Sequence, residues 1–199
     1  YNKMSIEEIC NKYDIENYTI NEDGSIDVDG KVNIINSTLE KLPLNFNKVT
    51  GYFNCENNLL TTLEGCPKEV EFYFSCRDNK LTSLEGGPKK VLNNYNCSGN
   101  LLTTLKGCPE YVGGGTFNCS WNNLTDLDFI PVFIKRKFYC DNNPIASISN
   151  QMYLDFLKAF KSFKVIKDGV VNLKRLKYLM EMFDKRIDLK EIEKYYTIK

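Results

Sequence analysis

Eight cysteines are the residues of this chain best suited to covalent or metal chemistry. Thiols form disulfides, bind zinc or act as nucleophiles, and each use needs partners at a suitable spacing. The chain has no histidine, which removes the commonest general base and the commonest zinc ligand. No two cysteines form the closely spaced pair that a thiolate zinc site needs, and none has an evident base partner. The sequence therefore predicts no enzyme, no metal site and no cofactor.

Two other motifs resemble ligand-binding loops. The segment DGSIDVDG at 23–30 places three aspartates close together, but it lacks the calcium-loop register and the glutamate at the twelfth place. The three glycines at 113–115 are not followed by the Lys-Ser/Thr of a phosphate-binding loop. We interpret the first as a polar hairpin and the second as a bulge or loosened turn.

Five of the cysteines follow a fixed spacing instead. They recur every 21 or 22 residues, at Cys55, Cys76, Cys97, Cys119 and Cys140. Each lies in the same local text: aromatic-x-Cys-x-x-Asn-x-Leu-x-x-Leu-x-Gly-x-Pro. A first, degenerate copy has Ile34 in the cysteine place, so we count six rungs over 31–148. A fixed period of this length is typical of a solenoid.

The rung matches the leucine-rich repeat template, with an aromatic residue and Cys in the two apolar places of a short strand. Phe53 and Cys55 alternate with polar residues, as in a strand buried on one face. Asn58 and its equivalents are expected to bond the backbone of the adjacent turn and to satisfy one another in a ladder. Gly-x-Pro is expected to end the rung. The predicted fold class is an α+β repeat solenoid with one short parallel strand per rung.

Segments outside the repeat are predicted to cover its ends. A capping box at Ser5 predicts a helix to about Lys12, and residues 18–28 are predicted to form a hairpin. Helices are also predicted over 150–163, 172–183 and 188–195. The expected organisation is an N-terminal cap at 1–30, the six-rung array at 31–148, and a C-terminal helical cap or docking segment at 149–199.

Composition limits the possible partners and location. The 26 basic and 26 acidic residues balance, so neither nucleic acid nor an anionic membrane is an expected partner. No apolar run approaches the roughly 18 residues that span a bilayer. We expect no signal peptide, since the first twenty residues contain no apolar segment. Stacked parallel cysteines point the same way and cannot face each other, which predicts reduced thiols in a reducing compartment.

Outward-facing side chains of the strands remain as the candidate site. In a leucine-rich repeat these positions line the concave face, and exposed Trp, Tyr and Arg dominate protein-binding surfaces. The candidate partner-binding residues are Tyr52, Glu56, Tyr73, Arg77, Asp78, Trp121, Lys137 and Tyr139. Trp121 is the only tryptophan, at a position that is polar or glycine in the neighbouring rungs. An alternative is that Tyr52 and Tyr73 form an aromatic ladder that only stiffens the sheet.

The rung text F-x-C-S-x-N-x-L-T-x-L-x-G-C-P-K-x-V resembles the short leucine-rich repeat proteins encoded by large tailed bacteriophages. The lead-in at 18–30 and the exit Asn-Asn-Pro-Ile at 142–145 are similar to the same family. A more distant resemblance is to secreted effectors of enteric pathogens, but the chain has no cysteine after Cys140 to serve their ligase activity. The phage resemblance implies a protein-binding solenoid and does not supply a target.

The expected function is a non-enzymatic, phage-encoded module that binds a host or phage protein through its concave face. Inhibition of a host defence complex is one form this could take, and the expected location is the host cytoplasm. No small-molecule substrate is expected. The alternative is a structural component of the virion.

Overall fold

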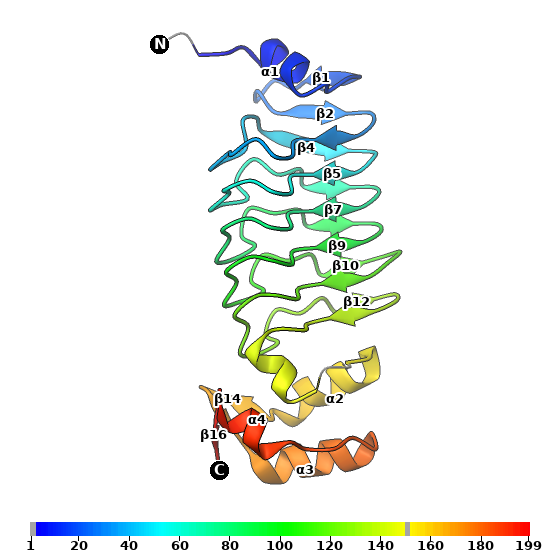
Figure 1. Cartoon of the computed structure of the whole chain (residues 1–199). Coiled ribbons are helices and arrows are strands. Elements are labelled where there is room, and N and C mark those ends of the chain that lie inside the picture. Colours follow the sequence, from blue (N-terminus) through cyan, green and yellow to red (C-terminus); the bar gives the residue numbers. More distant parts are fainter. Residues whose placement is uncertain (1–2, 150–151) are drawn as a thin grey trace.

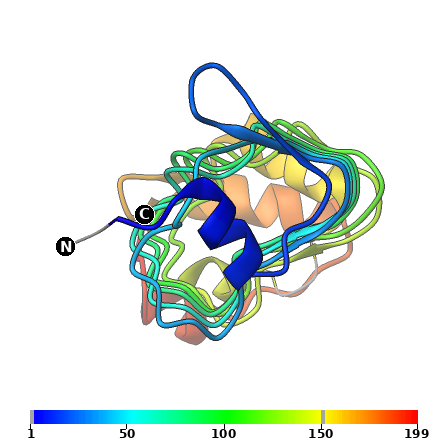
Figure 2. The same ribbon diagram turned by 90° about the horizontal axis from the view of Figure 1, so that it is seen from above.

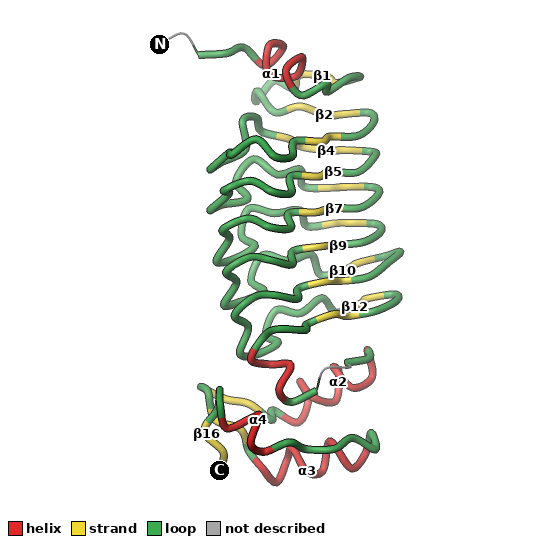
Figure 3. The backbone as a smooth tube through the Cα atoms, in the orientation of Figure 1, coloured by secondary structure: helices red, strands yellow, loops and turns green. Residues whose placement is uncertain are grey.

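The chain winds into a β-solenoid of about five turns, each taking about 21 residues (Figure 1). The computed structural model describes residues 3–149 and 152–199. The turns stack along a nearly straight axis, and seen from above they overlie one another closely (Figure 2). Most of each turn is loop, with two very short strands at similar places in successive turns (Figure 3).

One parallel sheet contains the predicted strands. Each of its strands is followed by the repeated cysteine, or by Ile34 in the first turn, and we call it the cysteine sheet. Neighbouring strands pair in register, so that Phe53, Phe74 and Tyr95 lie above one another. Its six strands are β3 (Val32–Asn33), β5 (Phe53–Asn54), β7 (Phe74–Ser75), β9 (Tyr95–Asn96), β11 (Phe117–Asn118) and β13 (Phe138–Tyr139).

The prediction of one strand per rung is wrong, because a second sheet lies after the prolines. Its repeated strands each end in a buried valine or isoleucine, and we call it the valine sheet. Gly-x-Pro thus turns the chain into another strand and does not end the rung, since the apolar residue after it packs inward. The strands are β1 (Tyr18–Ile20), β2 (Ile26–Val28), β4 (Phe46–Val49), β6 (Glu69–Val70), β8 (Lys90–Val91), β10 (Tyr111–Val112) and β12 (Phe133–Ile134).

The interior is built from stacked copies of the same side chain. The inward aromatic rings of the cysteine sheet form a continuous stack from Phe53 to Phe138, with centroid separations between 5.1 and 5.8 Å. The repeated cysteines and leucines are also buried. Burial of a Phe or Leu side chain contributes about 1.5–3 kcal/mol, so this column supplies much of the stability.

The repeated asparagines tie each turn to the one before it. Asn100 donates from Nδ2 to the carbonyl oxygens of Cys76, Cys97 and Ser98 at 3.1, 3.1 and 3.3 Å. Its Oδ1 accepts from the backbone N–H of Leu81 at 3.1 Å. Bonding to the adjacent backbone was predicted, but the amides do not satisfy one another, because both ends of each amide are used by main-chain groups.

The 22-residue rung keeps its register. β10 and β11 pair with both neighbours without a shift. The extra residue lies in the corner formed by Gly113–Gly115, between the two strands. A side chain at Gly115 would collide with Asn94 of the preceding turn, so the corner accepts the insertion only without a Cβ.

The predicted elements at the N-terminal end are present. α1 (Ile6–Lys12) carries both bonds of the Ser5 capping box and buries Cys10. β1 and β2 form the antiparallel hairpin, whose turn extends beyond the outline of the rungs (Figure 2). α1 lies across the N-terminal end of the stack.

A small helical unit follows the solenoid. Its elements are η1 (Pro144–Ser147), α2 (Leu154–Phe163), β14 (Ile166–Lys167), β15 (Val170–Val171), α3 (Leu173–Met182), α4 (Leu189–Glu193) and β16 (Thr197–Ile198). Asn172 and Asp188 cap α3 and α4 as predicted. α2 begins later than predicted, after Tyr153; residues 150 and 151 lie outside the described residues.

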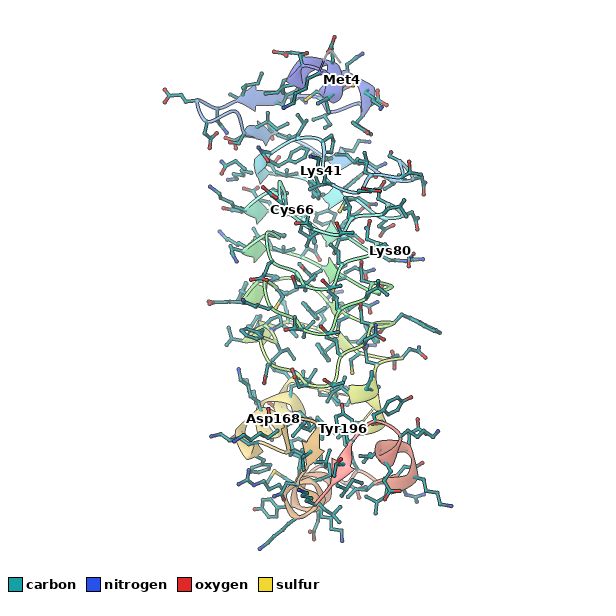
Figure 4. All side chains as sticks on the ribbon, turned by 90° about the vertical axis from the view of Figure 1, so that its left-hand side faces the viewer. Met4, Lys41, Cys66, Lys80, Asp168 and Tyr196 are labelled. Carbon is teal, nitrogen blue, oxygen red and sulfur yellow. The ribbon has the colours of Figure 1, made fainter. Side chains whose placement is uncertain are left out.

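This unit contacts the last turns of the solenoid. Met152 forms an isolated antiparallel bridge with Phe138 of the last cysteine-sheet strand. The hydroxyl of Tyr196 donates to the carbonyl oxygen of Thr125 at 2.7 Å, and Tyr196 lies near the junction in Figure 4. The three-stranded sheet of β14, β15 and β16 was not predicted.

Candidate binding surface

An open groove of about 870 Å³ runs along the cysteine sheet, where the outward side chains of four turns meet. Polar uncharged side chains dominate it, with aromatic and charged groups among them. The lining residues are Arg77, Asp78, Asn96, Ser98, Gly99, Asn118, Ser120, Trp121, Tyr139, Asp141 and Asn142.

Four of the eight predicted site residues meet in this groove: Arg77, Asp78, Trp121 and Tyr139. Because the stack is nearly straight, we name the surface by its sheet and not as concave. Trp121 is 66% exposed and Tyr139 is 39% exposed, so both present apolar area to solvent. The four residues come from three different turns, which register pairing holds in line.

Trp121 lies at a corner where the backbone is left-handed. The equivalent corners have positive φ as well, with 54° at Asp78, 67° at Gly99, 56° at Trp121 and 54° at Asn142. Asn, Asp and Gly adopt this region readily, whereas a bulky side chain does so at an energetic disadvantage. Tryptophan is therefore a poor choice for this corner on conformational grounds, and its exposed ring does not compensate through burial.

Asp78 is held in place by its neighbours. Its carboxylate accepts from Nε of Arg77 at 2.8 Å, and it is directed toward the next corner, where an added Cβ at Gly99 would collide with Oδ1. Both partners of the ion pair are partly exposed, with 53% of the Arg77 side chain and 39% of the Asp78 side chain in contact with solvent, so the pair orders the two side chains more than it stabilises the fold. The groove thus presents a carboxylate and a guanidinium two turns from the indole.

The other four predicted site residues lie outside the groove. Tyr52 and Tyr73 stack at a centroid distance of 4.7 Å and an angle of 7°. Burial, and then the neighbouring Tyr52 and Glu56, raise the pKa of Tyr73. Glu56 accepts from the hydroxyl of Ser75 at 2.6 Å, and Lys137 is exposed at the corner before β13. The stacked tyrosines thus form the ladder of the alternative interpretation.

Thiol chemistry finds no support in the geometry. All eight thiols are unpaired, and all except Cys108 are buried. Burial raises the pKa of each, to about 12 for Cys108 and Cys140. Thiols held in the neutral form are weak nucleophiles and weak metal ligands.

Within 3–149 and 152–199, no three His, Cys, Asp or Glu side chains lie close enough together to hold a metal ion. The aspartates of the 23–30 segment bond within the protein: Asp23 accepts from Ser25, and Asp27 accepts from Asn47. In the part of the chain that the structure describes, no helix is long and apolar enough to cross a membrane.

Sequence reasoning missed a second set of exposed residues, on the valine sheet. Tyr111 and Phe133 stack on its outer face, and Phe129 and Val132 are exposed beside them. The signal was present in the repeat: the charged residues after Gly-x-Pro give way to Tyr111 and Phe133 in the last rungs. It was overlooked because the strand that carries them was not predicted.

Comparison of the chain with known protein families, with curated proteins and with solved structures finds no match in any of the three.

Proposed function

We propose that this chain is a non-enzymatic interaction module that binds a partner protein across the groove of the cysteine sheet. Trp121 is the anchor, Arg77 and Tyr139 are further contacts in the same groove, and Tyr73 flanks it. The observation that carries the proposal is the exposed indole at a left-handed corner. Strain of this kind concentrates at functional sites, and Trp, Tyr and Arg are the side chains enriched in hot spots.

The chemistry of the groove favours a folded or extended protein as the ligand. Its amide and hydroxyl groups offer both donors and acceptors, as a polypeptide surface requires. An open groove spanning four turns suits a broad interface better than a small molecule, which binds in an enclosed pocket.

We further propose that the solenoid is a leucine-rich repeat protein of the short phage-encoded kind. The support is the rung pattern, in which the aromatic, Cys, Asn and Leu places are all buried. The helical segments at the two ends act as caps, and the module works in the host cytoplasm, where buried unpaired thiols persist. Inhibition of a host defence complex is the form of binding that fits a small soluble antagonist.

The test begins with affinity purification of the tagged intact protein from host lysate, with identification of the captured protein by mass spectrometry. Trp121→Ala should then weaken binding to that protein by about 2 kcal/mol or more with almost no change in melting temperature. Tyr178→Ala is the matched control, because Tyr178 is equally exposed but lies on α3. Equal affinity of the Trp121 variant and the control would contradict the proposal.

A structural role in the virion is the second candidate. It is favoured by the stiffness that stacked rings and asparagine bonds give to the column. If the protein is a virion component, it should co-purify with phage particles, and Trp121→Ala should not change the amount of protein found in the particles.

A further inference from the structure

The outer face of the valine sheet changes character along the stack. In its first turns the aligned outward residues are Lys48, Glu69 and Lys90, with an ion pair of 3.3 Å between the last two. In the next two turns the same line continues as Tyr111 and Phe133. Their rings stack at 4.9 Å, yet both remain exposed to solvent.

Phe129 adds a second unusual aromatic to this end of the sheet. It occupies the left-handed corner that the preceding turns give to glycine, with φ of 64° against 91° at Gly65, 85° at Gly86 and 93° at Gly107. A bulky side chain is disfavoured there, and Phe129 is 56% exposed, so packing does not account for its presence. This is the same combination of strain and exposure that marks Trp121, on a different face.

Phe129 borders a groove of about 520 Å³. Its lining residues are Lys89, Gly107, Cys108, Glu110, Phe129, Ile130 and Val132. Val132 is 67% exposed beside Phe129 and Phe133. We call Tyr111, Phe129, Val132 and Phe133 the apolar patch; contiguous exposed apolar surface of this kind marks interaction sites.

Basic residues surround the apolar patch. Lys89 lines the groove, Lys90 is in register with Tyr111, and the exposed Lys135 directly follows β12. Arg136 follows at the corner. Among the described residues Lys89, Lys135 and Arg136 have no ion-pair partner, and Glu110 is the one acid in the groove.

We propose that the apolar patch is a second docking site, separate from the groove of the cysteine sheet, which takes an acidic amphipathic segment of a partner protein. Apolar side chains of the segment cover Phe129, Val132 and Phe133. Its carboxylates pair with Lys89, Lys135 and Arg136, which gives the segment its orientation.

The experiment is selection from a random-peptide display library on the intact protein, with counter-selection on Phe129→Gly. That variant restores the residue of the other turns and relieves the left-handed strain, so it should be at least as stable as the original. Selected peptides should combine apolar residues with an excess of Asp and Glu. In fluorescence anisotropy they should bind Phe129→Gly about thirtyfold more weakly, the factor expected for loss of a hot-spot side chain.

Two controls separate the alternatives. Phe72→Ala removes an exposed phenylalanine elsewhere on the solenoid and should leave peptide binding unchanged, whereas Lys89→Glu should weaken it. Selected peptides without acidic excess, or with equal affinity for Phe129→Gly, would overturn the proposal. So would flotation of the protein with phosphatidylcholine–phosphatidylserine vesicles that is lost in Phe129→Gly, because the patch would then be a membrane contact.

Discussion

At the scale of single residues, the corners of the solenoid separate side chains that serve the fold from those that do not. Asn57, Asp78, Gly99 and Asn142 suit a left-handed corner, and Trp121 does not. Left-handed backbone at a residue without a local polar side chain costs roughly 1–3 kcal/mol. Burial of the indole would offset this cost, but the ring of Trp121 is mostly exposed to solvent.

Replacing Trp121 with Asn should therefore make the protein more stable and less able to bind. We expect the free energy of unfolding to rise by about 1 kcal/mol as the strain is relieved. Urea denaturation measures it, and Asn142→Trp, the converse change one turn later, should lower stability by a similar amount. A less stable Trp121→Asn variant would mean that the indole supports the fold.

Tyr95 is the second residue that differs in type from its equivalents in the other turns. The equivalent residues are Phe53, Phe74, Phe117 and Phe138, and among the described residues the Tyr95 hydroxyl is the buried side-chain atom left without a hydrogen-bond partner. Tyr95→Phe should raise the free energy of unfolding by about 1 kcal/mol, because an unsatisfied hydroxyl is removed without changing the ring stack. Thermal and urea unfolding should agree on the sign, and a loss of stability would reveal a partner for the hydroxyl.

At the scale of elements, the asparagine bonds reinforce the two parallel sheets in joining one turn to the next. Asn100→Ala would leave the buried N–H of Leu81 without its acceptor. The carbonyl oxygens of Cys76 and Cys97 would each lose one donor but keep a second, from Asn79 and Asn122. We expect the free energy of unfolding to fall by about 1–3 kcal/mol, the cost of one unsatisfied buried group. The exposed Asn123→Ala is the control and should change stability by less than about 0.5 kcal/mol.

The buried thiols make stability depend on pH in the alkaline range. Burial raises the pKa of Cys76, Cys97 and Cys119 in the folded protein, whereas unfolded thiols titrate near about 8.5. The unfolded state therefore loses protons first as pH rises, and the linkage favours unfolding. Stability should be fully present below about pH 8.5 and fall above it, by up to about 1.4 kcal/mol per pH unit for each thiol.

Urea unfolding under reducing conditions at pH 7 and pH 10 measures this effect. The two midpoints should differ strongly in the original protein and less in Cys76→Ala, which has one buried thiol fewer. Equal midpoints at the two pH values would contradict the account of the thiols as buried neutral groups.

Local patterns sufficed for some elements and not for others. The period, the buried aromatic, Cys and Leu places, and the caps at Ser5, Asn172 and Asp188 were predictable because each depends on residues near in sequence. The valine-sheet strands were not predictable. A two-residue strand such as Lys90–Val91 contains one buried residue, and it forms a strand only by pairing with the strands of the neighbouring turns. β16 pairs with β15 although α3 and α4 lie between them in the chain, and no local pattern encodes that pairing.

The same limit applies to the candidate site. Trp121 stood out by type and position, and four predicted residues converge in the groove because register is fixed by the repeat. The left-handed corners were not foreseen, since backbone handedness at an Asn, Asp or Gly place is not apparent from residue type alone. The apolar patch was not predicted, because the valine-sheet strands that carry Tyr111 and Phe133 were not predicted.

At the scale of the whole molecule, the segment after the solenoid is expected to protect its last turn. Deleting residues 150–199 would remove the bridge from Met152 to Phe138 and the Tyr196 bond, and expose Ile145 and Ile148. Because an uncovered solenoid end exposes apolar side chains and unpaired strand edges, we expect aggregation. Size-exclusion chromatography with light scattering measures it; a folded, monomeric truncated protein would make the segment an independent module.

Hydroxyl-radical footprinting of the complex with the captured partner tests the central claim most directly. Trp121 and Tyr139 are exposed in the free protein and readily oxidised, while Tyr178 on α3 serves as the internal reference. The account predicts that partner binding slows oxidation of Trp121 and Tyr139 several-fold and leaves Tyr178 unchanged. Unchanged oxidation of Trp121 in the saturated complex would contradict binding across the cysteine-sheet groove.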